Sequence, residues 1–119
     1  MSEYTKHLVP RPELRERIID TAVEAFSAHG IKSITMDDIA TSLGISKRTL
    51  YEVFSDKETL LEECILKGQK EGDEFLKNVL ATSGNVLEVL LKCYQRSIEQ
   101  FHATNKKFFE DIKKYPKAY

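Results

Sequence analysis

The sequence predicts an all-α protein. Apolar residues recur at spacings of three and four along most of the 119 residues, which is the pattern of amphipathic helices. No segment alternates apolar and polar residues as a half-buried strand does, and the three prolines, Pro10, Pro12 and Pro116, lie near the ends. We therefore expect a three-helix helix-turn-helix domain, followed by a long linking helix and a further, partial helical domain.

Composition is that of a soluble globular protein without an overall basic surface. Hydrophobic residues make up 41% of the chain, the formal net charge is -1, and no apolar run approaches the roughly 18 residues of a membrane helix. Residues 1–55 hold seven Lys and Arg against eight Asp and Glu. Non-specific attraction to nucleic acid is therefore expected to be weak, although a local basic patch would suffice for a specific site.

Residues 1–11 are expected to form a flexible N-terminal arm, because they show no apolar periodicity and include Pro10. Basic side chains at Lys6, His7, Arg11 and Arg15 could follow a DNA backbone, as basic arms do in other proteins. A plain disordered terminus accounts for the same residues and is the simpler interpretation.

The first helix is predicted to begin at Pro12, since proline suits a first helical turn, and Glu13 and Glu16 favour the positive end of its dipole. Gly30 is expected to end this helix, and Ile31 to make the apolar contact that often follows such an end. The buried face of the helix is predicted to consist of Leu14, Ile18, Ala22, Ala25 and Phe26.

Two short helices are predicted next, joined by a tight turn. Thr35 is a good N-cap for the first, and Asp38 completes a capping box. Gly44 is expected to end that helix in a left-handed conformation, followed by Ile45 as the apolar residue of the turn. Ser46 caps the second helix. Ile39, Ala40, Leu43, Leu50 and Phe54 are predicted to face inward, which leaves Lys47, Arg48, Thr49 and Tyr51 facing out.

This pair of helices is the pattern of a helix-turn-helix, whose second helix can place its N-terminal side chains in a DNA major groove. Lys47 and Arg48 can donate to guanine N7 and O6, and Thr49 can contact a thymine methyl group. Tyr51 can rest its ring on a sugar and donate its hydroxyl to a phosphate.

A long fourth helix of about 25 residues is predicted to begin with a capping box between Ser55 and Glu58. Lys57 at its start could hold a phosphate or be an ordinary solvated lysine. Gly68 and Gly72 share one face, which indicates either close approach of another helix or a bend. The inward residues are predicted to be Leu60, Leu61, Cys64, Ile65, Phe75, Leu76, Val79 and Leu80.

Two more helices are predicted after the break at residues 82–84. Asn85 with Glu88 caps the fifth, whose apolar stripe comprises Leu87, Leu90, Leu91, Tyr94, Ile98 and Phe101. Asn105 caps the sixth, which is expected to run to Tyr115 and to stop at Pro116.

The region from Leu14 to Leu61 resembles the N-terminal signature of TetR-family transcriptional regulators. The resemblance is carried, in order and spacing, by Gly30, Ile34, Thr35, Ile39, Ala40, Leu43, Gly44, Ile45, Ser46, Thr49, Leu50, Tyr51, Phe54, Lys57, Glu58, Leu60 and Leu61. It implies a DNA-binding domain at residues 12–55, with a linking helix and a partial effector-binding and dimerisation domain at residues 56–119. The DNA-binding residues it implies are Thr35, Ser46, Lys47, Arg48, Thr49, Tyr51 and Lys57.

The resemblance further implies a cytoplasmic homodimer that represses transcription from a palindromic double-stranded DNA operator in response to a small-molecule effector. Candidate effector-pocket walls are Phe75, Leu76, Leu90, Tyr94 and Phe101, for each of which core packing is the commoner role. The chain departs from the family at Arg48, where a small residue is usual, and at Val53, where a ring or polar group is usual. It also ends before the usual dimerisation helices, which makes a fragment the favoured interpretation.

Other functions fit the sequence less well. A truncated helical interaction module without DNA binding is the main alternative, favoured by the near-neutral charge. An enzyme is disfavoured because His7, His29 and His102 are scattered and no acid/base pair gathers, and no cofactor or metal is expected. Cys64 and Cys93 could form a redox switch, but apolar surroundings are typical of inert thiols in a reducing cytoplasm.

Overall fold

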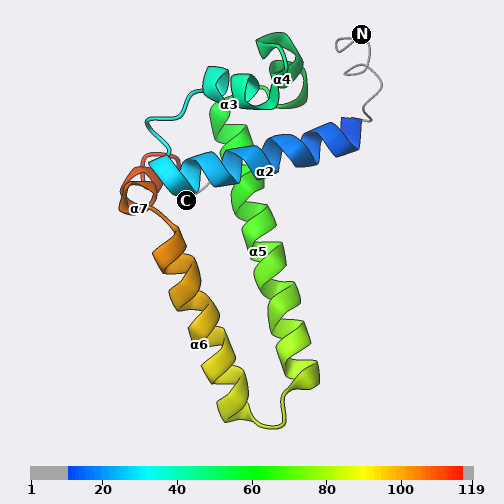
Figure 1. Cartoon of the computed structure of the whole chain (residues 1–119), viewed down its shortest axis with the longest axis vertical. Helices are drawn as coiled ribbons and strands as arrows, with labels where there is room; N and C mark the ends of the chain where they lie inside the picture. The colour runs from blue at the N-terminus through cyan, green and yellow to red at the C-terminus, as the bar shows by residue number, and fades with distance from the viewer. Residues whose placement is uncertain (1–10, 117–119) are drawn as a thin grey trace.

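The structure, a computed structural model, describes residues 11–116, apart from the side chain of Arg11. Within that range it contains six helices and no strand, which confirms the all-α prediction (Figure 1). The helices are α2 (Arg11–His29), α3 (Met36–Leu43), α4 (Lys47–Val53), α5 (Lys57–Thr82), α6 (Val86–Ala103) and α7 (Lys106–Ile112). The predicted arm spans residues 1–11, of which residues 1–10 lie outside the described range, whereas Arg11 belongs to α2, which begins one residue before the predicted start at Pro12.

The main core lies where α2, α3, α4 and the first turns of α5 meet. Its largest fully buried side chains are Phe26, Ile18, Ile31, Ile39, Leu50, Leu60 and Leu61. The predicted inward faces of α2 and of the two short helices supply most of these residues, because the apolar spacing of each helix selects one face for burial. A polar seam flanks this core, where Arg15 on α2 pairs with Glu63 on α5 at 2.8 Å and Lys67 pairs with Asp20.

The local signals of the helix-turn-helix are confirmed. Thr35 accepts a hydrogen bond from the backbone N–H of Asp38 at 3.0 Å, and the Asp38 carboxylate accepts one from the N–H of Thr35 at 2.8 Å. Gly44 ends α3 with φ of 70°, and Gly30 follows α2 with φ of 84°, both in the left-handed region that favours glycine. The Ser46 hydroxyl accepts from the N–H of Thr49 at 3.1 Å and so caps α4.

The start of the long helix differs from the prediction by one residue. The N-cap is Asp56, whose carboxylate accepts from the N–H of Thr59 at 2.7 Å, so a capping box between Ser55 and Glu58 is wrong. Asp is as good an N-cap as Ser, and two adjacent cap residues cannot be ranked from sequence alone.

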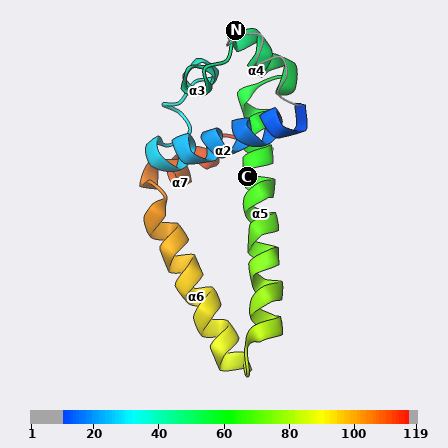
Figure 2. The same cartoon turned by 45° about the vertical axis from the view of Figure 1, so that its right-hand side comes forward.

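Helices α5 and α6 form an antiparallel hairpin that extends away from the three-helix domain (Figures 1 and 2). The helix α5 runs unbroken for 26 residues through Gly68 and Gly72. A Cβ at Gly68 would meet nothing within 4 Å, and one at Gly72 would only touch Arg96 at 3.7 Å. Within the described chain, close approach of another helix therefore does not explain either glycine.

The apolar stripe of α6 is largely exposed. None of its residues, all of which the structure describes, is buried, and Val86 and Leu87 near the hairpin turn are 74% and 75% exposed. In the hairpin, Val79 of α5 is buried, whereas Leu76, Leu80, Leu90 and Tyr94 are exposed. The predicted stripe exists, but the described part of the chain does not cover it.

Helix α7 docks against the end of α2 and the loop that follows it. The buried carboxylate of Asp111 accepts hydrogen bonds from the backbone N–H groups of Ile31, at 3.1 Å, and Lys32, at 2.8 Å. Asn105 caps α7, as predicted, and its own N–H donates to the Ser27 carbonyl at 2.7 Å. The helix ends at Ile112, three residues before Tyr115, because turns with i→i+3 hydrogen bonds replace its last predicted turn.

Candidate nucleic-acid interface

Helix α4 has a buried side and an exposed side, with Thr49 and Val53 half-buried between them. Leu50 and Phe54, the residue just after the helix, are buried against α2 and α3. The side chains of Lys47, Arg48 and Tyr51 are exposed, and Tyr51 is 44% exposed despite its large ring. The described chain therefore presents the two cations and the phenol of α4 to solvent, as the helical phase predicts.

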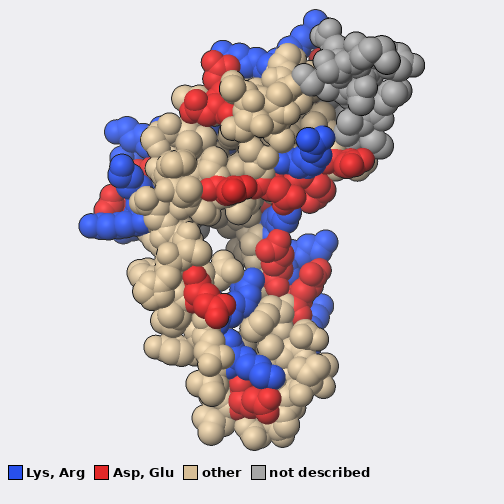
Figure 3. All heavy atoms as spheres, viewed as in Figure 1, with Lys and Arg blue, Asp and Glu red and all other residues tan. Residues whose placement is uncertain are grey.

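Each cation on α4 has a nearby carboxylate. The Lys47 Nζ lies 3.7 Å from the Asp37 carboxylate on α3, and the Arg48 Nε lies 3.4 Å from the Glu52 carboxylate one turn later. Such exposed pairs contribute little to stability, so a phosphate or base edge can replace the carboxylate at small cost. Figure 3 shows Lys and Arg atoms along the upper edge of the molecule, over α3 and α4, with Asp and Glu atoms beside them. The surface is locally mixed in charge.

The hydroxyl groups predicted at this interface also cap the helices. Thr35 Oγ1 and Ser46 Oγ accept backbone N–H groups, and Ser46 Oγ lies 2.8 Å from Thr49 Oγ1. Thr35 and Ser46 are exposed, whereas Thr49 is half-buried. A capping hydroxyl still carries one hydrogen that can be donated outward, so capping and contact with a phosphate are compatible roles.

Lys57 lies in neither of the settings considered from the sequence. Its side chain is half-buried, and its Nζ is 5.9 Å from the ring centres of both Phe26 and Tyr115. Burial lowers the pKa of Lys57, and the carboxylates of Asp111 and Asp38 act in the opposite direction. The ammonium group lies between the aromatic rings of α2 and of the segment after α7. This arrangement does not support the phosphate contact inferred for Lys57.

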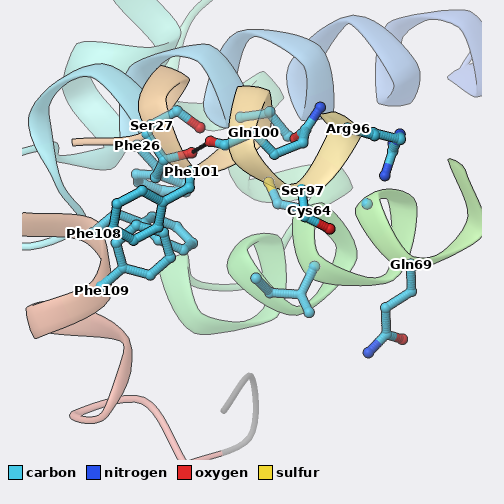
Figure 4. Close-up of a pocket in the computed structure, with 14 residues that line it drawn as sticks. Phe26, Ser27, Cys64, Gln69, Arg96, Ser97, Gln100, Phe101, Phe108 and Phe109 are labelled. Carbon is cyan, nitrogen blue, oxygen red and sulfur yellow. Dashed lines mark hydrogen bonds between the residues drawn. The ribbon is translucent and has the colours of Figure 1, made fainter. Parts of the chain in front are cut away.

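A cavity of about 560 Å³ lies between α2, α5, α6 and α7 (Figure 4). Of the five predicted pocket walls, Phe101 lines this cavity, while Phe75, Leu76, Leu90 and Tyr94 do not. The wall instead includes residues that sequence reasoning assigned to the core or passed over, namely Val23, Phe26, Ser27, Cys64, Ile65, Gly68, Gln69, Arg96, Ser97, Gln100, Thr104, Phe108 and Phe109. The contribution of α2 had no local signal, because it depends on how α7 docks.

Cys64 in the cavity wall is expected to be chemically inert. Burial raises the pKa of its thiol to about 12, and its Sγ donates to the Ile19 carbonyl over 3.9 Å. At pH 8 only about one thiol in 10⁴ would be the reactive thiolate. Titration with a disulfide reagent should therefore modify half-buried Cys93 in the folded chain and Cys64 only after denaturant is added. Equal rates for both thiols in the folded state would contradict this assignment and revive a redox role.

The described range contains neither a cluster of metal-binding side chains nor a helix suited to a membrane. Among residues 11–116, no group of three or more His, Cys, Asp or Glu side chains is placed to hold a metal ion. No helix of that same range is both long and apolar enough to cross a membrane.

Known proteins resemble this chain in sequence and in fold. Residues 18–64 match the profile of "Bacterial regulatory proteins, tetR family". The chain is 33% identical over 72 residues, 60% of its length, to IcaR of Staphylococcus aureus strain Newman, a negative transcriptional regulator of the biofilm operon icaADBC. It is 42% identical over 43 residues, 36% of its length, to MftR of Mycobacterium tuberculosis, assigned as a transcriptional regulator of mycofactocin biosynthesis. These matches span 37% of IcaR and 22% of MftR.

A crystal structure from Mesorhizobium loti MAFF303099, assigned to the TetR family of transcriptional regulators, has the same fold. It superposes with a TM-score of 0.71 at 24% sequence identity, covering 92% of this chain and 58% of the other. The similarity therefore extends beyond the helix-turn-helix to the α5–α6 hairpin and α7, since these make up the rest of the described chain.

Proposed function

We propose that this chain, whose residues 18–64 match the tetR family of bacterial regulatory proteins, is a member of that family and a sequence-specific DNA-binding repressor. The observation that carries the proposal is the exposed face of α4, which presents two cations and a phenol above a fully buried Leu50. To enter a major groove, a helix needs one side packed firmly on the protein core and cations on its opposite, exposed side. The family is one of transcription regulators, and we propose no enzymatic activity.

The side chains of α3 and α4 suit different parts of a DNA duplex. Lys47 and Arg48, in the first turn of α4, would donate to guanine edges, and the methyl group of Thr49 would meet thymine. Tyr51, Thr35 and Ser46 would donate hydroxyl hydrogens to phosphates. The near-neutral charge of the chain, -1 overall, supports binding through these local contacts in preference to a general electrostatic field.

We propose that the active species is a cytoplasmic homodimer on a palindromic operator. A dimer would place two copies of α4 in successive major grooves, about 34–36 Å apart, or at a multiple of that spacing. The negative regulator IcaR supports repression as the outcome. Selection of random duplexes by the purified chain, followed by sequencing, tests the whole proposal. Enrichment of an inverted repeat is expected, and no enrichment would favour a helical interaction module without DNA binding.

Arg48 is expected to determine base preference. Its side chain is 90% exposed, and its pair with Glu52 is easily exchanged for a base. Replacing Arg48 by Ala should weaken binding to the selected site by roughly 5- to 150-fold, which corresponds to about 1–3 kcal/mol for one base contact, and should relax selection at one position. Repeating the selection with the variant measures both effects. The control is Lys77→Ala, on the α5–α6 hairpin, which should change neither the affinity nor the base preference. If Arg48→Ala selects the same DNA sequence as the unaltered chain, Arg48 does not read a base.

A further inference from the structure

The helix-turn-helix carries more negative than positive charge. Residues 35–54 hold two cations, Lys47 and Arg48, against three carboxylates, Asp37, Asp38 and Glu52, which gives this segment a formal net charge of -1. All five residues are exposed. A surface that binds DNA through charge alone needs an excess of cations, because the affinity comes from counterions released as phosphates are neutralised. The carboxylates of this segment therefore oppose a general attraction to DNA.

One of the three carboxylates has a structural role. Asp38 closes the capping box of α3, where its carboxylate accepts the backbone N–H of Thr35. Asp37 and Glu52 do not take part in the caps of α3 and α4. Their charge can therefore be removed without disturbing the ends of these two helices.

Asp37 and Glu52 each lie beside one cation of α4. The Asp37 carboxylate, in the first turn of α3, is 3.7 Å from Lys47 Nζ, and the Glu52 carboxylate is 3.4 Å from Arg48 Nε. At these distances each carboxylate cancels much of the field that its cation would present to an approaching polyanion. Both pairs are exposed, so breaking either one costs the fold little.

A phosphate and a base edge would meet these pairs differently. A phosphate that binds Lys47 or Arg48 brings a second negative charge next to the carboxylate, and like charges placed together oppose binding. A guanine edge is neutral and brings no such repulsion. It can also be bound by the two terminal amino groups of Arg48 alone, with the Glu52 carboxylate still beside Nε. The pairs therefore disfavour phosphate contacts more than base contacts.

We propose that Asp37 and Glu52 are specificity-determining residues, which oppose the binding of Lys47 and Arg48 to phosphates and leave both cations to base edges. This inference rests on the proposed function, because it concerns the choice among DNA sequences. Specificity is a difference of affinities, so weakening the complex with unrelated DNA raises it as effectively as strengthening the complex with the operator.

The experiment compares a duplex that the chain selects from a random pool with a shuffled duplex of equal length and composition. Fluorescence anisotropy of each labelled duplex, over a range of salt concentrations, gives its affinity for the unaltered chain, for Asp37→Asn, for Glu52→Gln and for the double variant. Freeing one cation should steepen the dependence of log K on log salt for the shuffled duplex by about 0.9, which corresponds to roughly eightfold tighter binding at about 0.1 M salt.

The selected duplex should gain less than about threefold from each substitution, because its base contacts do not depend on phosphate charge. The double variant should therefore lose at least about tenfold in the ratio of its affinities for the selected and the shuffled duplex. Since the expected result is a gain of binding, a variant that failed to fold could not imitate it.

Two variants make the same change of charge outside the helix-turn-helix. Asp73→Asn on α5 and Glu99→Gln on α6 each remove one exposed carboxylate from the hairpin, and they should alter neither the affinities nor the salt dependence. Equal effects of these controls would assign the gain to net charge and would overturn the proposal. Equal tightening of both duplexes by the double variant, or an unchanged salt dependence, would also overturn it.

Failure of this inference can be told from failure of the proposed function. A chain that selects a duplex, and whose affinity ratio survives both substitutions, keeps the proposed function and loses this role of Asp37 and Glu52. A chain that selects no duplex loses both.

Discussion

Replacing Asp111 by Ala is expected to lower the free energy of unfolding by roughly 2–4 kcal/mol. The carboxylate is buried and accepts the N–H groups of Ile31 and Lys32 at 3.1 and 2.8 Å. Both donors lie in the loop after α2, 80 and 79 positions earlier in the chain. Removing the acceptor leaves two N–H groups partly or wholly out of water without a partner, which costs more than the loss of an ordinary surface hydrogen bond.

Hydrogen exchange would separate local undocking of α7 from global destabilisation. In the unaltered chain, the amide hydrogens of Ile31 and Lys32 should exchange slowly, and in Asp111→Ala they should become fast even where the core of α2 stays protected. Glu110→Ala is the matched control, because Glu110 is exposed and, among residues 11–116, its carboxylate forms an ion pair only with exposed Lys106, at 3.6 Å. For that control, the free energy of unfolding measured in denaturant should change little. Slow exchange of both amides in Asp111→Ala would show that the carboxylate does not hold the loop.

Asp111 also shows where sequence reasoning ends. The caps at Thr35 and Ser46, the left-handed glycines and the inward face of α4 could all be predicted, because each depends on residues within one or two helical turns. Asp111 carries no such signal: in sequence it is one acidic residue on a short amphipathic helix. Its role arises only when α7 reaches the end of α2, and no local propensity encodes that contact.

The candidate site divides in the same way. The outward side of α4 follows from helical phase, so Lys47, Arg48 and Tyr51 lie where the sequence predicts them. The cavity does not follow, because prediction from apolar spacing selected Leu90 and Tyr94, whereas the wall uses the neighbouring face of α6 with Arg96 and Gln100. A face rich in polar residues resembles solvated surface until the packing of α2 and α7 encloses it.

Replacing Gly30 by Ala is expected to cost roughly 2–5 kcal/mol of stability, clearly more than the same change at Gly44. Both glycines have positive φ, 84° and 70°, so each substitution forces an L-residue into the left-handed region at a cost of about 1–2 kcal/mol. At Gly44 a Cβ would meet nothing within 4 Å. At Gly30 it would lie 2.7 Å from Lys107 Cβ and 3.1 Å from Asp111 Oδ2, so α7 must move.

The difference between the two variants, measured by denaturant unfolding, therefore isolates the cost of displacing α7. Combining Gly30→Ala with Asp111→Ala tests the same contact again, because residues that share a contact do not have additive effects. Once Asp111→Ala has released α7, Gly30→Ala should cost only its backbone strain, as Gly44→Ala does in either background. Full additivity of the Gly30 and Asp111 effects would instead mean that α7 does not rest on Gly30, and that the loop after α2 is held independently of it.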